Sequence, residues 1–247
     1  MKSSFWDEWK NISEIERSAI KALKVGKKLI LQSLPKKEIV AIYVKGSFIR
    51  REMNEKSDVD MVTIVCHSAF LKNLKRLDKK YATFFKPTLQ FRGYSLQELK
   101  TGKRTGTVFK MSPSPSRFVK HLPHYKCIYG KPLKPTNFFM RSNEHDLRWM
   151  IQGFNDLFLP RYKEKKFGFS EVIKQVFWLV ENEERFKGHN PPHSWKGLAK
   201  SIKDKNHIVH DAFRFRVHPT QDKRKKATFI RKLQAHLNSL ERLLKRS

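Results

Sequence analysis

The amino-acid sequence predicts an α+β protein of two domains, and two observations support this class. Three apolar runs with the β-branched character of strands lie before residue 95. From about residue 144 onward the apolar residues recur at helical spacing instead, and a segment with two prolines, 132–136, separates the regions. We therefore expect a first domain of α and β structure over residues 1–135 and an all-helical second domain over residues 136–247.

The first predicted element is a helix that begins near Ser13. Ser13 and Glu16 have the spacing of a capping box, in which the two side chains satisfy free backbone N–H groups at the helix start. Apolar residues then follow a helix-compatible pattern up to Leu34, and Pro35 ends it. This segment should precede the first strand.

Three short apolar runs follow, and each is typical of a strand. They lie at residues 39–44, 58–65 and 88–93, and a helix is predicted between the second and third runs at about 71–81. The first run stops at Gly46, as a buried strand that ends in a turn should.

The turn at Gly46 and Ser47 suits the binding of a polyanion. Gly46 has no Cβ, so a phosphate chain can approach the backbone closely. Successive backbone N–H groups and the Ser47 hydroxyl can then donate hydrogen bonds to phosphate oxygens. The sequence therefore indicates a cradle for a triphosphate.

Asp58 and Asp60 stand one residue apart at the start of the predicted strand 58–65. In a strand, side chains two residues apart point to the same face, so the two carboxylates can chelate one cation while Val59 and Met61 face the core. A carboxylate pair suits Mg²⁺ (or Mn²⁺), which keeps water and substrate phosphates in its remaining positions.

This order of a Gly-Ser turn, about ten residues and an Asp-x-Asp strand resembles the nucleotidyltransferase superfamily of the DNA polymerase beta type, in the branch that modifies aminoglycosides and lincosamides. The chain has GSFIRR at 46–51 and SDVD at 57–60. The resemblance implies a mixed-sheet nucleotidyltransferase domain followed by a helical substrate-binding domain. It also implies transfer of a nucleoside monophosphate from a magnesium-bound NTP, with ATP as the expected donor, to an acceptor hydroxyl or phosphate with release of pyrophosphate.

The resemblance also assigns roles to individual residues. Asp58 and Asp60 would be the catalytic carboxylates and would hold the metal. The residues expected to bind the nucleotide are Gly46, Ser47, Arg50 and Ser57.

Two positions depart from the family pattern. Arg51 stands where relatives tend to have glycine, and Gln90 stands where a third carboxylate is expected. An amide cannot act as a base and is a poor ligand for a dication, which leaves three possibilities open: a carboxylate from elsewhere completes the site, one metal suffices, or nucleotide is bound without turnover. In some relatives a glutamate of the helical domain is the base. The candidates here are Glu171, Glu181, Glu183 and Glu184, of which Glu171 is the one we select.

The net charge is +30, and residues 71–135 hold 16 Lys and Arg against two Asp and Glu. Such a field favours polyanions, so it indicates a nucleic-acid or phosphorylated acceptor, although a proteome of uniformly basic proteins would give the same composition. A second hypothesis is therefore a catalytically weakened nucleotidyltransferase-like protein that binds RNA.

A third hypothesis is an antitoxin-like partner that modifies a helical ribonuclease. Arg231 and His236 loosely match the Arg and His signature of HEPN ribonucleases, but such residues on a helix more often form a solvated face.

Composition limits the remaining classes. A hydrophobic content of 39% and an aromatic content of 12% indicate a globular chain, and there is no apolar run of membrane-spanning length. Two cysteines fit a reducing compartment. We expect a cytoplasmic protein without a membrane segment, whose partners are a nucleotide and a small-molecule, RNA or protein acceptor. A homodimer is compatible with this class, because relatives often complete the acceptor pocket across a dimer.

Overall fold

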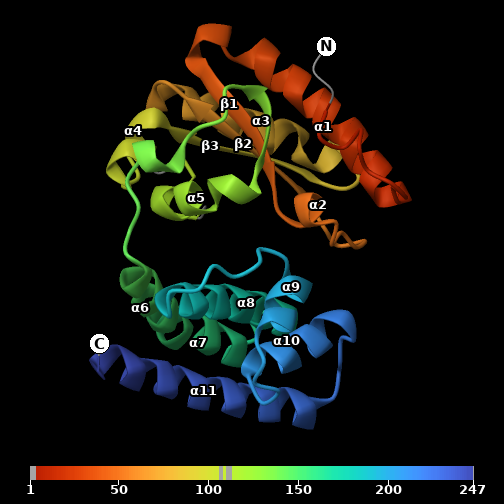
Figure 1. Ribbon diagram of the computed structural model, residues 1–247. Coiled ribbons are helices and arrows are strands. Elements are labelled where there is room, and N and C mark those ends of the chain that lie inside the picture. The colour runs from red at the N-terminus through yellow and green to blue at the C-terminus, as the bar shows by residue number, and fades with distance from the viewer. Residues whose placement is uncertain (1–3, 106–107, 110–112, 247) are drawn as a thin grey trace. The chain divides into compact units, whose positions relative to one another are not determined.

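The computed structural model describes residues 4–105, 108–109 and 113–246. The chain divides into two compact units, Met1–Arg141 and Ser142–Ser247, which we call unit 1 and unit 2 (Figure 1). Each unit has its own hydrophobic core. The sequence places a boundary after residue 135, slightly before the division between the two units.

Unit 1 is built on a four-stranded mixed sheet with the strand order β3-β2-β1-β4. β1 is antiparallel to both β2 and β4, whereas β2 and β3 are parallel. Helix α3 (Leu71–Tyr81) connects the parallel pair, since parallel neighbours need a crossover. The strands are β1 (Ile39–Lys45), β2 (Val59–Val65), β3 (Leu89–Ser95) and β4 (Lys126–Gly130).

Helices cover both faces of this sheet (Figure 1). Helix α1 (Glu14–Ser33) and α3 pack on one face, and α4 (Leu96–Thr101) and α5 (Pro115–His121) pack on the other. The short helix α2 (Ser47–Arg50) follows β1 directly. Single 3-10 turns lie at Lys36–Glu38, Ser68–Phe70, Ala82–Phe84, Leu122–His124 and Pro135–Asn137.

The predicted capping box at the start of α1 is confirmed. Ser13 N–H donates to Glu16 Oε2 at 2.8 Å, and Glu16 N–H donates to Ser13 Oγ at 3.4 Å. A second capping box, formed by Ser95 and Glu98, starts α4 at the end of β3. Both boxes satisfy N–H groups that have no acceptor within the helix.

The regular elements that the structure describes in unit 2 are all helices. Helix α8 is central: Val176, Phe177, Leu179 and Val180 on it are fully buried in a core to which the other helices contribute. A π-helical turn, Phe154–Phe158, joins the first two helices of the unit. The α-helices are α6 (Asn143–Gly153), α7 (Leu159–Lys163), α8 (Phe169–Phe186), α9 (Trp195–Ser201), α10 (Ile208–Val217) and α11 (Lys223–Arg246).

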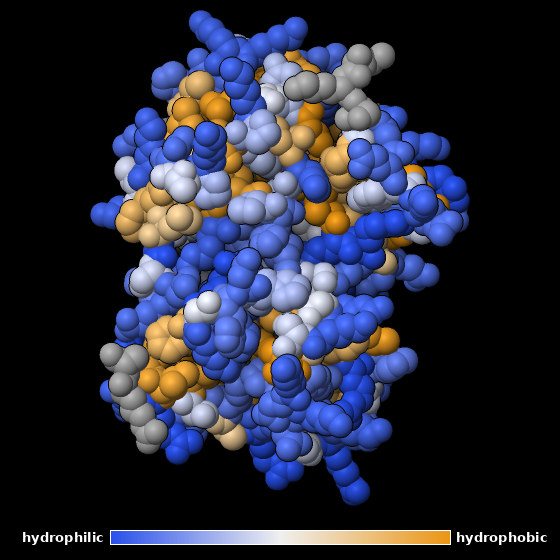
Figure 2. Space-filling model, viewed as in Figure 1, coloured by the Kyte–Doolittle hydropathy of each residue, from blue (hydrophilic) through white to orange (hydrophobic). Residues whose placement is uncertain are grey.

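The α+β class, with a mixed sheet followed by helices, is thus confirmed. Across the described part of the chain, no helix combines the length and apolarity needed to cross a bilayer. The face of the molecule in Figure 2 is largely hydrophilic, in keeping with a chain in which 31% of residues are charged.

Candidate active site

The Gly46–Ser47 turn links the end of β1 to the start of α2. Gly46 has φ +85°, a conformation that favours glycine, and a Cβ built at this position would lie 2.7 Å from Asp60 Oδ2. Only glycine therefore lets the backbone pass this close to the carboxylate. Because the first N–H groups of a helix have no acceptor within it, the start of α2 also offers backbone donors beside Asp60.

Asp58 directly precedes β2, and Asp60 is the second residue of that strand, where its carboxylate lies against the turn. Val59 and Met61, which alternate with them, are fully buried in the core, whereas the Asp60 side chain is partly exposed. This alternation is the one that the sequence predicts. Lys45, the register partner of Asp60 on β1, places Nζ 3.1 Å from Asp60 Oδ1, so a cation already lies against this carboxylate.

Gln90 lies beside the two aspartates, because Asp60 and Gln90 are register partners on the parallel strands β2 and β3. The Gln90 amide nitrogen donates a hydrogen bond to Asp58 Oδ2. Its oxygen accepts hydrogen bonds from Arg92 Nε at 3.2 Å and Nη2 at 2.9 Å, and Arg92 Nη1 also pairs with Asp78 Oδ2 at 3.0 Å.

These neighbours fix the orientation of the Gln90 amide. Arg92 has only donors, so the Gln90 oxygen must face it, and the NH₂ group must then face the Asp58 carboxylate. Position 90 consequently presents a donor to the site rather than an oxygen ligand. The four residues form a chain of hydrogen bonds, in which Asp78 orients Arg92, Arg92 orients Gln90, and Gln90 donates to Asp58.

The residues present fit a single hard divalent cation. The carboxylates of Asp58 and Asp60, two residues apart in the chain, supply oxygen ligands, which Mg²⁺ prefers. Lys45 Nζ at 3.1 Å from Asp60 shows that the carboxylate accepts a positive partner at this position. Because Gly46 has no Cβ, the backbone N–H donors at the start of α2 can lie next to the Asp60 carboxylate.

Arg50 and Ser57, two predicted nucleotide ligands, both have protein partners. Arg50 Nε donates to Glu52 Oε2 at 2.8 Å, and the arginine side chain is almost buried. Ser57 Oγ accepts a hydrogen bond from Asn54 N–H at 2.9 Å and so fixes the loop that precedes Asp58. Their contact with a nucleotide stays a prediction.

Arg51, which departs from the family pattern, connects the turn to the N-terminal segment. Its φ of +55° is a left-handed conformation, which favours glycine. Its guanidinium donates to Glu16 Oε1 and Oε2 and to the carbonyls of Lys10 and Asn11, at 2.9 to 3.0 Å, and lies 5.0 Å from the Trp9 ring centroid. These contacts offset the strain of the backbone. The hydrogen bond from Arg51 lowers the pKa of Glu16 to about 2.

Phe48 of α2 packs against aromatic residues of the N-terminal segment. It is fully buried, and its ring lies 5.0 Å from Trp9, 6.2 Å from Phe5 and 6.4 Å from Trp6, measured between centroids. The N-terminal segment therefore holds both the ring of Phe48 and the guanidinium of Arg51. Sequence reasoning missed this support, although the tryptophans at 6 and 9 were a visible signal.

The acids of unit 2 divide into exposed and buried ones. Glu171, the selected candidate base, lies in the first turn of α8 with its side chain 42% exposed and an ion pair to Lys174 at 3.7 Å. Glu181 and Glu183 are buried on the same helix. The role of Glu171 as the base stays a prediction.

Glu183 is the centre of a buried ionic cluster that the sequence did not predict. Lys187 Nζ lies 2.6 Å from its Oε1, and His236 Nε2 and His207 Nε2 lie 2.9 and 3.4 Å from its Oε2. Burial alone would raise the pKa of Glu183, but the neighbouring imidazoles of His207 and His236 and the Lys187 ammonium outweigh it and hold the pKa below its usual range. The expectation that His236 belongs to a solvated face is therefore wrong.

Two histidines and a carboxylate also raise the question of a metal site in unit 2. His207 Nδ1 accepts a hydrogen bond from Val209 N–H at 3.2 Å, which caps the start of α10. With Nδ1 as the acceptor, the proton of neutral His207 is on Nε2, the atom that faces Glu183. A protonated nitrogen cannot bind a metal, so we interpret the cluster as an ionic one.

Comparison with known proteins supports the fold. The chain is similar to spectinomycin adenyltransferase AAD(9) from Enterococcus faecialis, whose crystal structure contains ATP and spectinomycin, with a TM-score of 0.51 and 13% sequence identity. The match covers 87% of this chain and 99% of the other. No protein-family model and no curated protein matches the sequence. The chain therefore shares its fold with this adenyltransferase, in keeping with the resemblance drawn from the sequence.

Proposed function

We propose that this protein is a nucleotidyltransferase, which moves a nucleoside monophosphate from a magnesium-bound NTP, ATP in the first place, to an acceptor hydroxyl or phosphate and releases pyrophosphate. One observation carries the proposal: the Asp60 carboxylate lies against a glycine turn, and Asp58 stands two residues before it, next to the start of the same strand. The fold shared with an ATP-using adenyltransferase supports it.

The residues around the turn would bind different parts of the magnesium-bound nucleotide. Gly46 and Ser47 would hold the phosphate chain through backbone N–H groups and the hydroxyl. Asp58 and Asp60 would hold Mg²⁺ (or Mn²⁺), which when bound neutralises the charge of the phosphates during in-line attack. Arg50 and Ser57 border the site and would release their present partners on nucleotide binding.

Of the three possibilities that Gln90 raises, the geometry favours a site with one tightly held metal. Gln90 offers Asp58 an N–H donor and cannot complete a second cation site. Two fixed cations, Lys45 beside Asp60 and Arg92 behind Gln90, supply positive charge where relatives with a third carboxylate would recruit a second ion. Because the protein already holds the positive charges of Lys45 and Arg92 in place, these side chains need not move when charge develops in the reaction.

A small molecule with a hydroxyl group is the acceptor class we favour. The similar adenyltransferase was solved with spectinomycin, a small-molecule acceptor by its name. RNA and protein acceptors would use the same chemistry. Glu171 remains the proposed general base, and a homodimer remains the proposed assembly for a complete acceptor pocket.

Pyrophosphate release tests the function directly. The protein is incubated with Mg²⁺, each NTP and a panel of aminocyclitols, short RNAs and candidate protein acceptors, with Asp58→Asn and Asp60→Asn as matched inactive variants. We expect release by wild type with one acceptor class and none by either variant. Equal release by wild type and both variants would refute the assignment.

Unit 1 also supports a second candidate, an RNA-binding protein whose nucleotidyltransferase site is weakened at Gln90. Residues 71–135 hold 16 basic and two acidic residues, a charge suited to a polyanion. Steeply salt-dependent RNA binding without pyrophosphate release would favour this candidate. Co-purification with a helical ribonuclease would favour the antitoxin-like role instead.

A further inference from the structure

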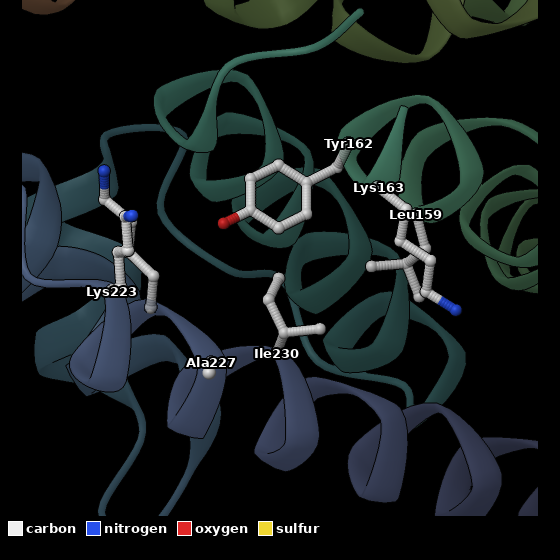
Figure 3. Close-up of a pocket in the computed structure, with 7 residues that line it drawn as sticks. Leu159, Tyr162, Lys163, Lys223, Ala227 and Ile230 are labelled. Carbon is white, nitrogen blue, oxygen red and sulfur yellow. The ribbon is translucent and has the colours of Figure 1, made fainter. Parts of the chain in front are cut away.

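A cavity of about 320 Å³ lies in unit 2 between α7 and the start of α11 (Figure 3). It lies apart in sequence from the turn and the aspartates of unit 1, and the proposed function leaves it unused. Its lining combines apolar side chains with lysines: Leu159, Tyr162, Lys163, Lys223, Lys226, Ala227 and Ile230.

The floor of the cavity is apolar. Leu159 is buried in the core of unit 2, Ile230 packs against the same core, and Ala227 adds only a methyl group from the exposed face of α11. The Tyr162 ring forms a further wall, and Figure 3 shows its hydroxyl directed toward the side on which Lys223 lies. Burial raises the pKa of Tyr162, so this hydroxyl stays a proton donor at neutral pH.

The rim of the cavity is cationic. None of the residues that line it is acidic, and within the described part of the chain Lys163 and Lys223 have no carboxylate within ion-pair distance. Lys226 contacts only neutral groups: Nζ lies 3.1 Å from Gln221 Oε1 and 5.7 Å from the Phe169 ring centroid. The lining therefore carries three positive charges and no negative one, so its charge is complementary to that of an anion.

We propose that this cavity binds a small organic acid, with its apolar body on the floor of Leu159, Ala227 and Ile230 and its anionic head at the cationic rim, on the side where Lys223 lies and to which the Tyr162 hydroxyl points. The aliphatic floor favours an alkyl or aryl body over a nucleobase, because single-stranded nucleic acids bind mainly by stacking on aromatic faces. The three lysines exclude a metal cation. This site is independent of the proposed nucleotidyl transfer.

The experiment measures binding of the fluorescent probe 1-anilinonaphthalene-8-sulfonate to the full chain, with displacement by naphthalene-1-carboxylate, decanoate or polyuridylate. Ala227→Trp fills the cavity without changing charge and replaces an exposed helical residue. A triple variant, Lys163→Gln, Lys223→Gln and Lys226→Gln, removes the rim charges. Its charge-matched control is Lys196→Gln, Lys200→Gln and Lys203→Gln, three exposed lysines elsewhere in unit 2.

We expect one displaceable probe site whose Kd rises at least about tenfold in Ala227→Trp and in the rim triple variant, but stays unchanged in the control triple variant. Circular dichroism confirms that all variants fold. Equal loss of binding in the two triple variants would show attraction to the net charge alone and would overturn the proposal. Unchanged binding in Ala227→Trp, or displacement by polyuridylate and not by the small acids, would overturn it as well.

Discussion

Arg51 and Glu16 form a two-pronged ion pair, in which the guanidinium donates to both carboxylate oxygens at 2.9 and 3.0 Å. Glu16 belongs to the first turn of α1, and Arg51 directly follows α2. The pair therefore ties the N-terminal helix to the segment that starts with the Gly46–Ser47 turn. The support of the candidate site depends on residues that lie 35 positions apart in the sequence.

Removing the charge of Glu16 should destabilise unit 1. Glu16→Gln should lower the free energy of unfolding at neutral pH by about 1–3 kcal/mol, because it weakens hydrogen bonds to a charged group. The pKa of Glu16 is lowered from 4.5 to about 2, so this contribution is present above pH 4.5 and is lost as the pH falls toward 2. Urea unfolding at pH 7 and pH 3, with hydrogen exchange to locate the change, measures both.

Glu8→Gln serves as the control for this variant, because Glu8 is an exposed acid of the same N-terminal segment. It should change the free energy of unfolding by less than about 0.5 kcal/mol. The ion pair would not stabilise unit 1 if Glu16→Gln lowered the free energy of unfolding no more than Glu8→Gln does. The same conclusion would follow if the loss in Glu16→Gln were as large at pH 3 as at pH 7.

Gly46→Ala should affect the site more than a glycine substitution elsewhere. Gly46 and Gly188 have the same φ of +85°, but a Cβ at Gly188 has no atom within 4 Å, whereas one at Gly46 lies 2.7 Å from Asp60 Oδ2. Each alanine should cost about 1–2 kcal/mol of backbone strain. Only Gly46→Ala should also weaken metal-dependent nucleotide binding, measured by calorimetry. Equal nucleotide affinity in the two variants would show that the turn does not contact the nucleotide.

Gln90→Glu should change the number of metal ions that the site holds. With a non-hydrolysable ATP analogue, we expect wild type to bind a single tightly held Mn²⁺, counted by electron paramagnetic resonance. A carboxylate at position 90 adds an oxygen ligand beside Asp58 and should create a second binding event. Gln90→Leu, which removes the amide without adding charge, should still bind a single ion. Two equivalent ions in wild type would contradict a one-metal site.

Glu183→Gln should destabilise unit 2 strongly, by about 3 kcal/mol, because it removes the buried carboxylate that pairs with Lys187 and faces His207 and His236. The pKa of Glu183 is depressed, so the stabilisation is present above the ordinary pKa of a glutamate and is lost as the pH falls below it. Thermal unfolding at pH 7 and pH 4 measures the effect. Glu164→Gln breaks only an exposed ion pair with Lys166 and should change little; a similar loss in both variants would refute the cluster's role.

Local patterns in the sequence predict much of unit 1. The helix expected at 71–81 coincides with α3, and the capping box at Ser13 starts α1 as predicted. The alternation of Asp58, Val59, Asp60 and Met61 places the carboxylates and the core residues on opposite faces, as a period of two requires. These features depend on neighbours in the chain, which is why the sequence alone reveals them.

Features that depend on distant residues could not be predicted. Gln90 meets Asp58, 32 positions away in the sequence, only because β3 pairs with β2. Arg92, which orients the Gln90 amide, is in turn held by Asp78 of α3. The partners of Glu183 are Lys187 directly after α8, His207 directly before α10, and His236 in α11. No periodicity records such contacts, because they arise when separate elements pack.

Calorimetric binding of each NTP with Mg²⁺ or Mn²⁺, to wild type and to Asp60→Asn, tests the central claim most directly. We predict binding of at least one NTP that requires the metal and that is lost in Asp60→Asn, because the variant removes one of the two metal-binding carboxylates. Undiminished binding in Asp60→Asn, or no binding to the wild-type protein, would contradict a nucleotide site at the Gly46–Ser47 turn.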